Sequence, residues 1–193
     1  MRFFKLALIA ALPLMLATGV SANEYEPQLR DLAKSKIQAW LSNPSVVAAI
    51  KAQNKSHDGY SEAKIIAMDK QWRAETNASS RPMIDGILGN QLSSFLKGKK
   101  EESEGLYTEI FVMDNKGMNV GQSDITSDYW QGDEAKWKKT YAVGAESLHI
   151  GKVKEDESTQ TFQSQVSLPI VDPKDGSVIG AITVGINVEL LGQ

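Results

Sequence analysis

The sequence of 193 residues contains no cysteine, so neither a disulfide framework nor thiol chemistry is available to it. It has only two histidines, His57 and His149. It also lacks the GxSxG, HExxH, P-loop and GxGxxG motifs of common hydrolases, metalloproteases and nucleotide-binding proteins. Catalysis therefore has no positive support in the sequence. We expect a protein that is not an enzyme and that uses no cofactor.

Long apolar runs are scarce as well, and the one that stands out lies at the N-terminus. Arg2 and Lys5 precede an apolar run from Leu6 to Leu16, and the small residues Val20-Ser21-Ala22 follow it. This order is typical of a cleaved secretory signal peptide, which we assign to residues 1–22. The alternative is an uncleaved N-terminal anchor, but the run is short for a membrane span and contains Pro13.

The chain has no excess of basic charge. Without Arg2 and Lys5 the mature chain keeps 19 of the 21 basic residues against 24 acidic ones, a net charge of −5. An acidic surface disfavours nucleic acid as a partner. Export without cysteines suits a bacterial periplasm better than a eukaryotic secreted domain. We therefore expect a periplasmic protein that does not bind nucleic acid.

Residues 23–104 have the periodicity of helices. Apolar residues recur at helical spacing from Leu29 to Leu41, and Asn43-Pro44 and Ser61 are typical helix starts. Pro82 opens a further helix, and residues 97–104 form a charged connection. The apolar stripe of the first helix is most simply core, and the alternative is a homodimer interface.

Residues 105–193 change to the period of strands. Two Asp-led turns that end in glycine are expected, Asp114–Gly117 and Asp172–Gly176. Each turn is expected to join one strand to the next. A short helix at 132–141, strands at 147–153, 161–171 and 178–191, and a turn at 155–158 complete the pattern. We predict an antiparallel sheet that forms one domain with the helices.

Three segments resemble a known family. The strand ending in FVMD with its NKG turn, the loop SDITSDYWQGDEAKW, and QVSLPIVDPKDGSVIGAITVGINVELL are similar to bacterial periplasmic Cache domains, also called PAS-like or PDC sensors. The resemblance implies an α+β fold in which long N-terminal helices pack behind a five-stranded antiparallel PAS-like sheet. It also implies a small-molecule pocket on the opposite sheet face, covered by residues 123–141.

Within that loop, aromatic and acidic side chains are the candidates for ligand contact. Tyr129, Trp130 and Trp137 would form an aromatic cage, or alternatively fill the gap between the loop and the sheet. Asp128 and Asp133 would bind a cationic group, or alternatively form turns and cap the next helix. The spacing of the acids does not match an EF-hand loop, so we expect no metal site.

Polar residues on the predicted strand 161–171 are candidates of a second kind. Gln163 and Gln165 alternate with Phe162 and Val166, so their amides would orient a ligand if that sheet face is the pocket floor, and would be plain surface if it is not. Weaker candidates of the same kind are Ser123, Lys138 and Tyr141. The expected ligand-binding set is Ser123, Asp128, Tyr129, Trp130, Asp133, Trp137, Tyr141, Gln163 and Gln165.

Together these features predict a non-catalytic, small-molecule-binding sensor domain, whose ligand is an amino acid, an amine or a small carboxylate. Because the sequence stops at Gln193, directly after its last strand, we expect a freestanding module that acts on a membrane sensor protein. The alternative is an interaction protein without a ligand, which docks on such a sensor through its helical face. A ligand sensor needs a cavity beside Tyr129, Trp130 and the polar strand residues, whereas an interaction protein would fill it with side chains.

Overall fold

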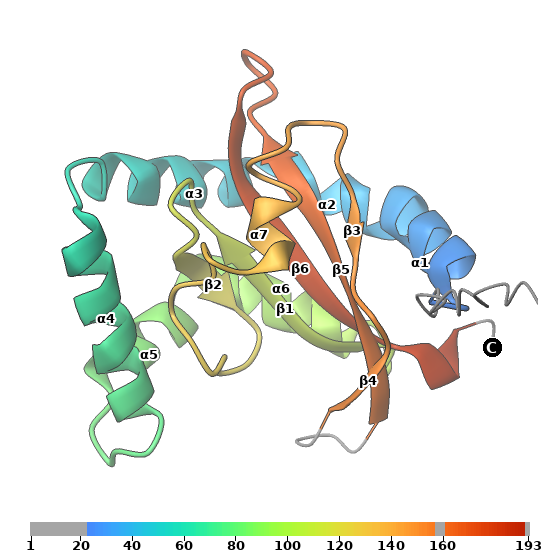
Figure 1. Cartoon of the computed structure of the whole chain (residues 1–193), viewed down its shortest axis with the longest axis horizontal. Helices are drawn as coiled ribbons and strands as arrows, with labels where there is room; N and C mark the ends of the chain where they lie inside the picture. Colours follow the sequence, from blue (N-terminus) through green and yellow to red (C-terminus); the bar gives the residue numbers. More distant parts are fainter. Residues whose placement is uncertain (1–22, 157–160, 192–193) are drawn as a thin grey trace, which may run out of the picture.

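The computed structural model describes residues 23–156 and 161–191, and it has the α+β architecture that was predicted. A twisted antiparallel sheet forms the middle layer, with helices behind it and one short helix in front (Figure 1). The predicted signal peptide of residues 1–22, and part of a predicted turn at 155–158, lie outside the described residues.

The strands of the sheet follow the order β2-β1-β6-β5-β3, and β4 also pairs with β5. Their bounds are β1 Tyr107–Met113, β2 Asn119–Gln122, β3 His149–Ile150, β4 Lys154–Asp156, β5 Thr161–Val171 and β6 Val178–Asn187. The expected five-stranded sheet is present, with β4 as an additional short strand. The strand predicted at 147–153 is limited to His149–Ile150, and β4 forms where residues 155 and 156 were expected in a turn. The additional strand forms because β5 is long. Its outer edge pairs with β3 near the middle and with β4 at its start.

Helices fill the first half of the described chain, as predicted. Their bounds are α1 Glu26–Leu32, η1 Ala33–Ile37, α2 Gln38–Leu41, α3 Pro44–Ser56, α4 Glu62–Glu75, α5 Pro82–Leu88 and α6 Gln91–Glu101. The expected caps are confirmed: Asn43 accepts a hydrogen bond from the Ser45 N–H, and Ser61 from the Lys64 N–H. The first helix is not α-helical throughout, because η1 is a π-helical turn between α1 and α2.

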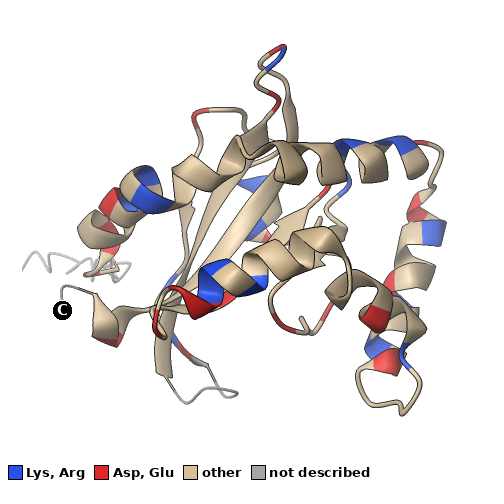
Figure 2. Ribbon diagram, turned by 180° about the vertical axis from the view of Figure 1, so that it is seen from behind, with Lys and Arg blue, Asp and Glu red and all other residues tan. Residues whose placement is uncertain are grey.

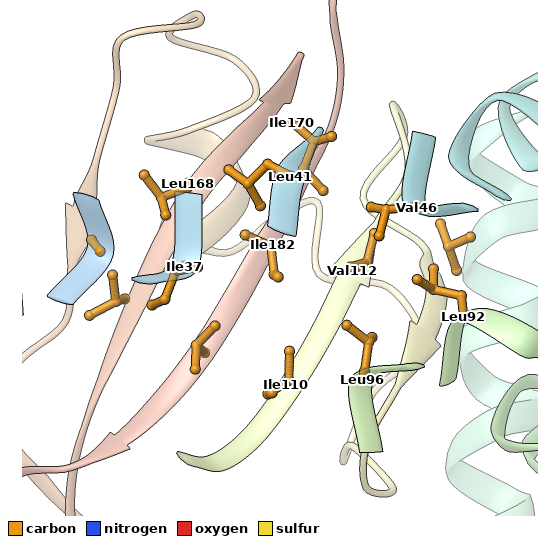
Figure 3. Close-up of a cluster of buried hydrophobic side chains, with 14 of the residues drawn as sticks. Ile37, Leu41, Val46, Leu92, Leu96, Ile110, Val112, Leu168, Ile170 and Ile182 are labelled. Carbon is orange, nitrogen blue, oxygen red and sulfur yellow. The ribbon is translucent and has the colours of Figure 1, made fainter. Parts of the chain in front are cut away.

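The main core lies between these helices and the sheet. Ile37 and Leu41 meet Leu168, Ile170 and Ile182 of the strands, and all five are buried (Figure 3). Leu92 and Leu96 of α6 occupy the same layer beside Ile110 and Val112. Fully burying a side chain of this size contributes roughly 1.5–3 kcal/mol. The apolar stripe of the first helix is thus core within one chain, and a homodimer through that helix stays a prediction.

The last strand is shorter than predicted. We expected it to reach residue 191, but β6 ends at Asn187, whose side chain accepts a hydrogen bond from the Glu189 N–H at 3.0 Å. This side-chain bond replaces strand pairing and starts the 3₁₀ turn η2 Val188–Leu190. The sheet therefore ends near the entry of β5, where Gln163 is the register partner of Asn187.

The outer helices carry charges of both signs, which Figure 2 shows along α1, α4 and α6. Ion pairs within these helices include Arg30–Glu26 at 2.7 Å and Lys99–Glu102 at 2.5 Å. Among the described residues no helix is both long and apolar enough to span a membrane. The helical face is thus a mixed polar surface, with charges of both signs side by side.

Candidate functional site

The short helix α7 (Ala135–Lys138) lies against the face of the sheet that the long helices leave free (Figure 1). Its anchor is Trp137, which stacks on Tyr141 with ring centroids 4.8 Å apart. Both rings pack on Phe111, Met113 and Ala181 of the strands. The Trp137 indole N–H also donates to the Asp114 carbonyl oxygen at 3.1 Å. These contacts fix α7 at a set height above the sheet.

A cavity of about 550 Å³ opens beside this helix, between α7, the β3–β4 segment and β5. It is lined by Glu134, Ala135, Lys136, Lys139, His149, Ile150, Gly151, Lys152, Lys154, Gln163 and Gln165. Four lysines against one glutamate give the lining a net charge of +3 when His149 is neutral. The whole chain has a net charge of −3, so basic residues are concentrated at this place.

The floor of the cavity is held by polar side chains of the strands. The Gln165 amide donates to Glu109 Oε1 at 2.8 Å, and the Gln163 amide oxygen accepts from the Thr108 hydroxyl. Gly185 of β6 makes room for this arrangement, because a Cβ there would stand only 2.5 Å from Gln163 Oε1. The glutamine side chains are therefore fixed in orientation before any ligand arrives.

One lysine of the lining, Lys136, is neutralised by a neighbour among the described residues. Lys136 pairs with Glu134 at 3.1 Å, donates to Gln131 Oε1 at 3.1 Å, and lies 5.2 Å from the centre of the Phe111 ring. Within residues 23–156 and 161–191, the other lysines of the lining, Lys139, Lys152 and Lys154, form no ion pair. The cavity thus offers uncompensated positive charge.

The pKa of His149 is shifted by this electrostatic environment. Burial lowers the pKa of its imidazole, and the charges of Lys139 and Lys136 lower it further. At neutral pH the ring is therefore uncharged, with one nitrogen able to donate and the other to accept a hydrogen bond. It makes no hydrogen bond to a serine or carboxylate of the described chain, an arrangement that a Ser-His-acid hydrolase would need.

The structure brings two predicted site residues, Gln163 and Gln165, to the cavity lining. Trp137 and Tyr141 lie next to it as the support of α7. Ser123 lies elsewhere: its hydroxyl accepts from the Ile110 N–H at 2.8 Å and donates to Asp124 Oδ2 at 2.6 Å. Ser123 therefore acts locally in joining β2 to β1.

The acidic and aromatic centre of the predicted loop packs against α4 and does not line the cavity. Tyr129 is buried and stacks on Trp72 at 5.6 Å between ring centroids. Asp128 Oδ1 lies 2.8 Å from Arg73 Nη1 but accepts no hydrogen bond from the described residues, so the attraction is ionic without a directed bond. Asp69 accepts the backbone N–H groups of Tyr129 and Trp130, both at 3.0 Å.

Two further predicted residues are also occupied elsewhere or exposed. The Trp130 indole donates to the Lys116 carbonyl oxygen at 2.8 Å, across the turn between β1 and β2. Asp133 is exposed, and α7 takes Glu134 as its N-cap without a side-chain bond. Asp133 is thus not the helix cap that we considered as its alternative role.

Sequence reasoning missed the basic residues of the lining. Lys136 lies on α7 and Lys139 is its C-cap three positions later, a spacing that places two residues on one side of a helix. Lys152 and Lys154 are two apart, which places them on one side of an extended segment. Each signal was visible in the sequence, but only the pairing of β3 and β4 with β5 brings the two pairs together. Across the described ranges, no group of three or more His, Asp and Glu residues is placed to hold a metal ion.

No family model matches the chain, and no curated protein matches it in sequence. The sensory domain of the Campylobacter jejuni chemoreceptor Tlp3 (CcmL) is similar at 12% identity and a TM-score of 0.42, over 86% of this chain and 66% of that one. The same domain with isoleucine bound gives 13% identity and a TM-score of 0.40, over 85% and 64% of the two chains. The sensor domain of the V. cholerae histidine kinase DctB gives 14% identity and a TM-score of 0.37, over 84% and 57%.

The chain therefore spans less than two thirds of the length of each of these structures. Two of the three structures are of one chemoreceptor sensory domain, and the third is the sensor domain of a histidine kinase. With TM-scores of 0.42 or lower, the likeness is too distant for a ligand or a partner to be carried over to this chain.

Proposed function

We propose that the protein is a Cache-type sensor domain that binds a small anionic molecule, such as a carboxylate, in the cavity between α7, the β3–β4 segment and β5. The observation that carries this proposal is the lining itself, in which four lysines face one glutamate beside two oriented glutamine amides. A cavity of about 550 Å³ lies in the usual range for small-molecule sites.

The charge of the cavity separates the ligand classes that the sequence left open. An amine would meet Lys139, Lys152 and Lys154 with like charge, whereas a carboxylate would pair with them. Of the two acidic residues that favoured an amine in the sequence, Asp128 faces Arg73 and Asp133 is exposed outside the cavity lining. An amino acid would bind through its carboxylate, with its ammonium directed to Glu134 or Glu109.

The test is thermal unfolding and isothermal titration of residues 23–193 against small carboxylates and amines of matched length. A carboxylate that binds only the folded state raises the unfolding midpoint in proportion to the logarithm of its concentration. Amines of the same length are expected to have no effect. A ligand set made up only of amines would contradict the proposal.

A cavity-filling variant locates the binding site. Ala135 lines the cavity from α7, so Ala135→Trp is expected to block carboxylate binding while the chain stays folded. Ala48→Trp is the matched control, because Ala48 is an exposed helical alanine of α3 away from the cavity. Equal carboxylate affinity in both variants would place the site elsewhere.

The second candidate is an interaction protein that docks on a membrane sensor through its helical face. The packing of Tyr129 on Trp72 favours it, because this residue, expected to form part of a cage, is buried as core instead. The same titrations separate the two functions, since an interaction protein would bind no member of the panel.

We also propose that the protein acts in the periplasm after its first 22 residues are removed. The mass of the protein recovered from the periplasmic fraction tests this directly. Cleavage after Ala22 would give a chain beginning with Asn23. A full-length chain held in the membrane fraction would instead indicate an uncleaved anchor.

A further inference from the structure

We propose that His149 and Lys139 together bind the anionic group of the ligand, and that His149 takes up a proton when this group binds. The inference rests on the proposed ligand site and adds the regulation of that site by pH. His149, on the two-residue strand β3, would be the group of the cavity that responds to the charge of the ligand.

The position of His149 follows from strand register. His149 is the antiparallel partner of Ser167, and Ser167 lies two residues from Gln165 on β5. Side chains two apart on a strand share a sheet face, as do directly opposed partners on neighbouring strands. His149 and Gln165 therefore face the same side, and both line the cavity below α7.

Positive charge surrounds the imidazole on this side. The cations of the neighbouring elements are Lys136 and Lys138 of α7, Lys139 after it, Lys152 and Lys154 after β3, and Arg30 of α1. The acids are Glu134 before α7, Glu109 on β1, Glu146 before β3, Glu155 on β4 and, behind the sheet, Glu26 and Asp31 of α1. Glu134 forms an ion pair with Lys136, and Glu109 accepts a hydrogen bond from the Gln165 amide. Of the two lysines whose charges act on the ring, Lys136 is paired with Glu134, whereas Lys139 forms no ion pair with the described residues.

An anion reverses this balance. Burial and the charges of Lys139 and Lys136 hold the pKa of His149 below its ordinary value in the empty site. A negative group between Lys139 and His149 compensates the lysine charge and attracts a proton to the ring, which raises the pKa of His149. The imidazolium then donates a hydrogen bond to the anion in addition to its charge.

Linkage makes this coupling reciprocal. If the anion raises the pKa of His149, then protonation of His149 strengthens anion binding by the same factor. Between the pKa of the empty site and that of the occupied site, affinity is expected to rise by up to about tenfold for each pH unit of acidification. Outside that interval affinity is expected to be independent of pH.

Sulfate is the probe, because it keeps two negative charges across the titration range of histidine. The chain has only two histidines, so proton NMR of residues 23–193 resolves both rings, and the His149→Gln variant assigns them. Sodium sulfate is expected to raise the pKa of His149 by about one unit relative to sodium chloride at equal ionic strength. The ring of His57, which is bonded to Asp114 and is not part of the cavity lining, is the internal control.

Two variants test the roles separately by titration calorimetry at about pH 6 and about pH 8. His149→Gln is expected to bind sulfate with an affinity that no longer changes with pH. Lys139→Met is expected to weaken sulfate binding at both pH values. Lys55→Met, an exposed lysine of α3, is the matched control and is expected to keep the pH dependence of the unmodified chain.

The outcomes distinguish this inference from the proposal on which it rests. Sulfate binding that depends on Lys139 but is the same at both pH values would overturn the proton uptake and leave the anion site in place. Sulfate binding that is equally strong in Lys139→Met would overturn both the paired site and its location. If sulfate does not bind at either pH, the inference is wrong, and the carboxylate titrations then decide the proposed function alone.

Discussion

At the scale of single residues, the cavity depends on a glycine as much as on its charged lining. Gly185 of β6 lies under Thr108, Gln163 and Glu109, and a Cβ there would stand 2.5 Å from Gln163 Oε1 and 2.8 Å from Glu109 Cγ. Each of these atoms belongs to the bonded floor of the cavity, so none can withdraw without breaking a hydrogen bond. The absence of a side chain at 185 is thus what allows the floor to be polar.

Gly185→Ala is therefore expected to destabilise the chain by about 1–3 kcal/mol, because overpacking displaces these side chains. Chemical denaturation measures the loss. Gly98→Ala is the control, since Gly98 is helical and a Cβ there meets nothing within 4 Å. That exchange is expected to stabilise the chain by about 0.5–1 kcal/mol. An unchanged stability in Gly185→Ala would show that the floor yields easily.

At the scale of elements, one carboxylate of α4, that of Asp69, holds the loop that contains Tyr129 and Trp130. Asp69 presents one carboxylate oxygen to the N–H groups of Tyr129 and Trp130 and the other to Arg73 Nε at 2.7 Å. The two N–H groups are backbone donors of a segment that has no strand partner on this side. A single helical carboxylate thus replaces the sheet hydrogen bonds that the loop lacks.

Asp69→Ala is expected to lower the free energy of unfolding by about 2–4 kcal/mol, because it leaves two backbone donors near the core without an acceptor. Urea denaturation provides the comparison. Asp85→Ala serves as control: Asp85 is exposed and lies 3.6 Å from Arg81, in a surface pair expected to contribute less than about 1 kcal/mol. Similar losses of unfolding free energy in the two variants would contradict this role of Asp69.

At the scale of the whole molecule, the helical layer is tied to the far end of the sheet by Lys51 and Asp172. Lys51 of α3 pairs with Asp172, which begins the turn between β5 and β6 and accepts the Lys174 N–H at 3.0 Å. The hydrogen bond from Lys51 is the main reason that the pKa of Asp172 lies below its ordinary value. The pair thus joins the two layers in a pH-dependent way.

Because the pKa of Asp172 is lower in the folded than in the unfolded chain, its stabilisation is complete above the unfolded value and is lost as the pH falls through the folded value. We expect Asp172→Asn to lower the unfolding midpoint at neutral pH, and the difference from the unmodified chain to shrink on acidification below about pH 4. Thermal unfolding across this range measures it. A difference that is the same at every pH would mean that the carboxylate charge is not involved.

Much of the fold could be predicted because it is encoded in local patterns. The turns at Asp114–Gly117 and Asp172–Gly176 carry glycines with φ of 83° and 77°, which is the conformation that their sequence favours. The helix starts at Asn43 and Ser61 were equally local. Of the candidate site, Gln163 and Gln165 were placed by strand alternation. The role of Asp128 was not, because nothing local indicates that Arg73, 55 positions earlier, lies beside it.

By itself the sequence determined the long helices and strands, the two Asp-led turns, and which helical stripe enters the core, because periodicity and capping act over a few residues. Only the tertiary structure decided which polar groups meet. The lysines of α7 and of the β3–β4 segment converge because both elements pack against β5, and the acidic loop lies apart because α4 holds it. Charges from distant segments add up only where the chain folds them together, so the sign of the cavity is a property of the fold.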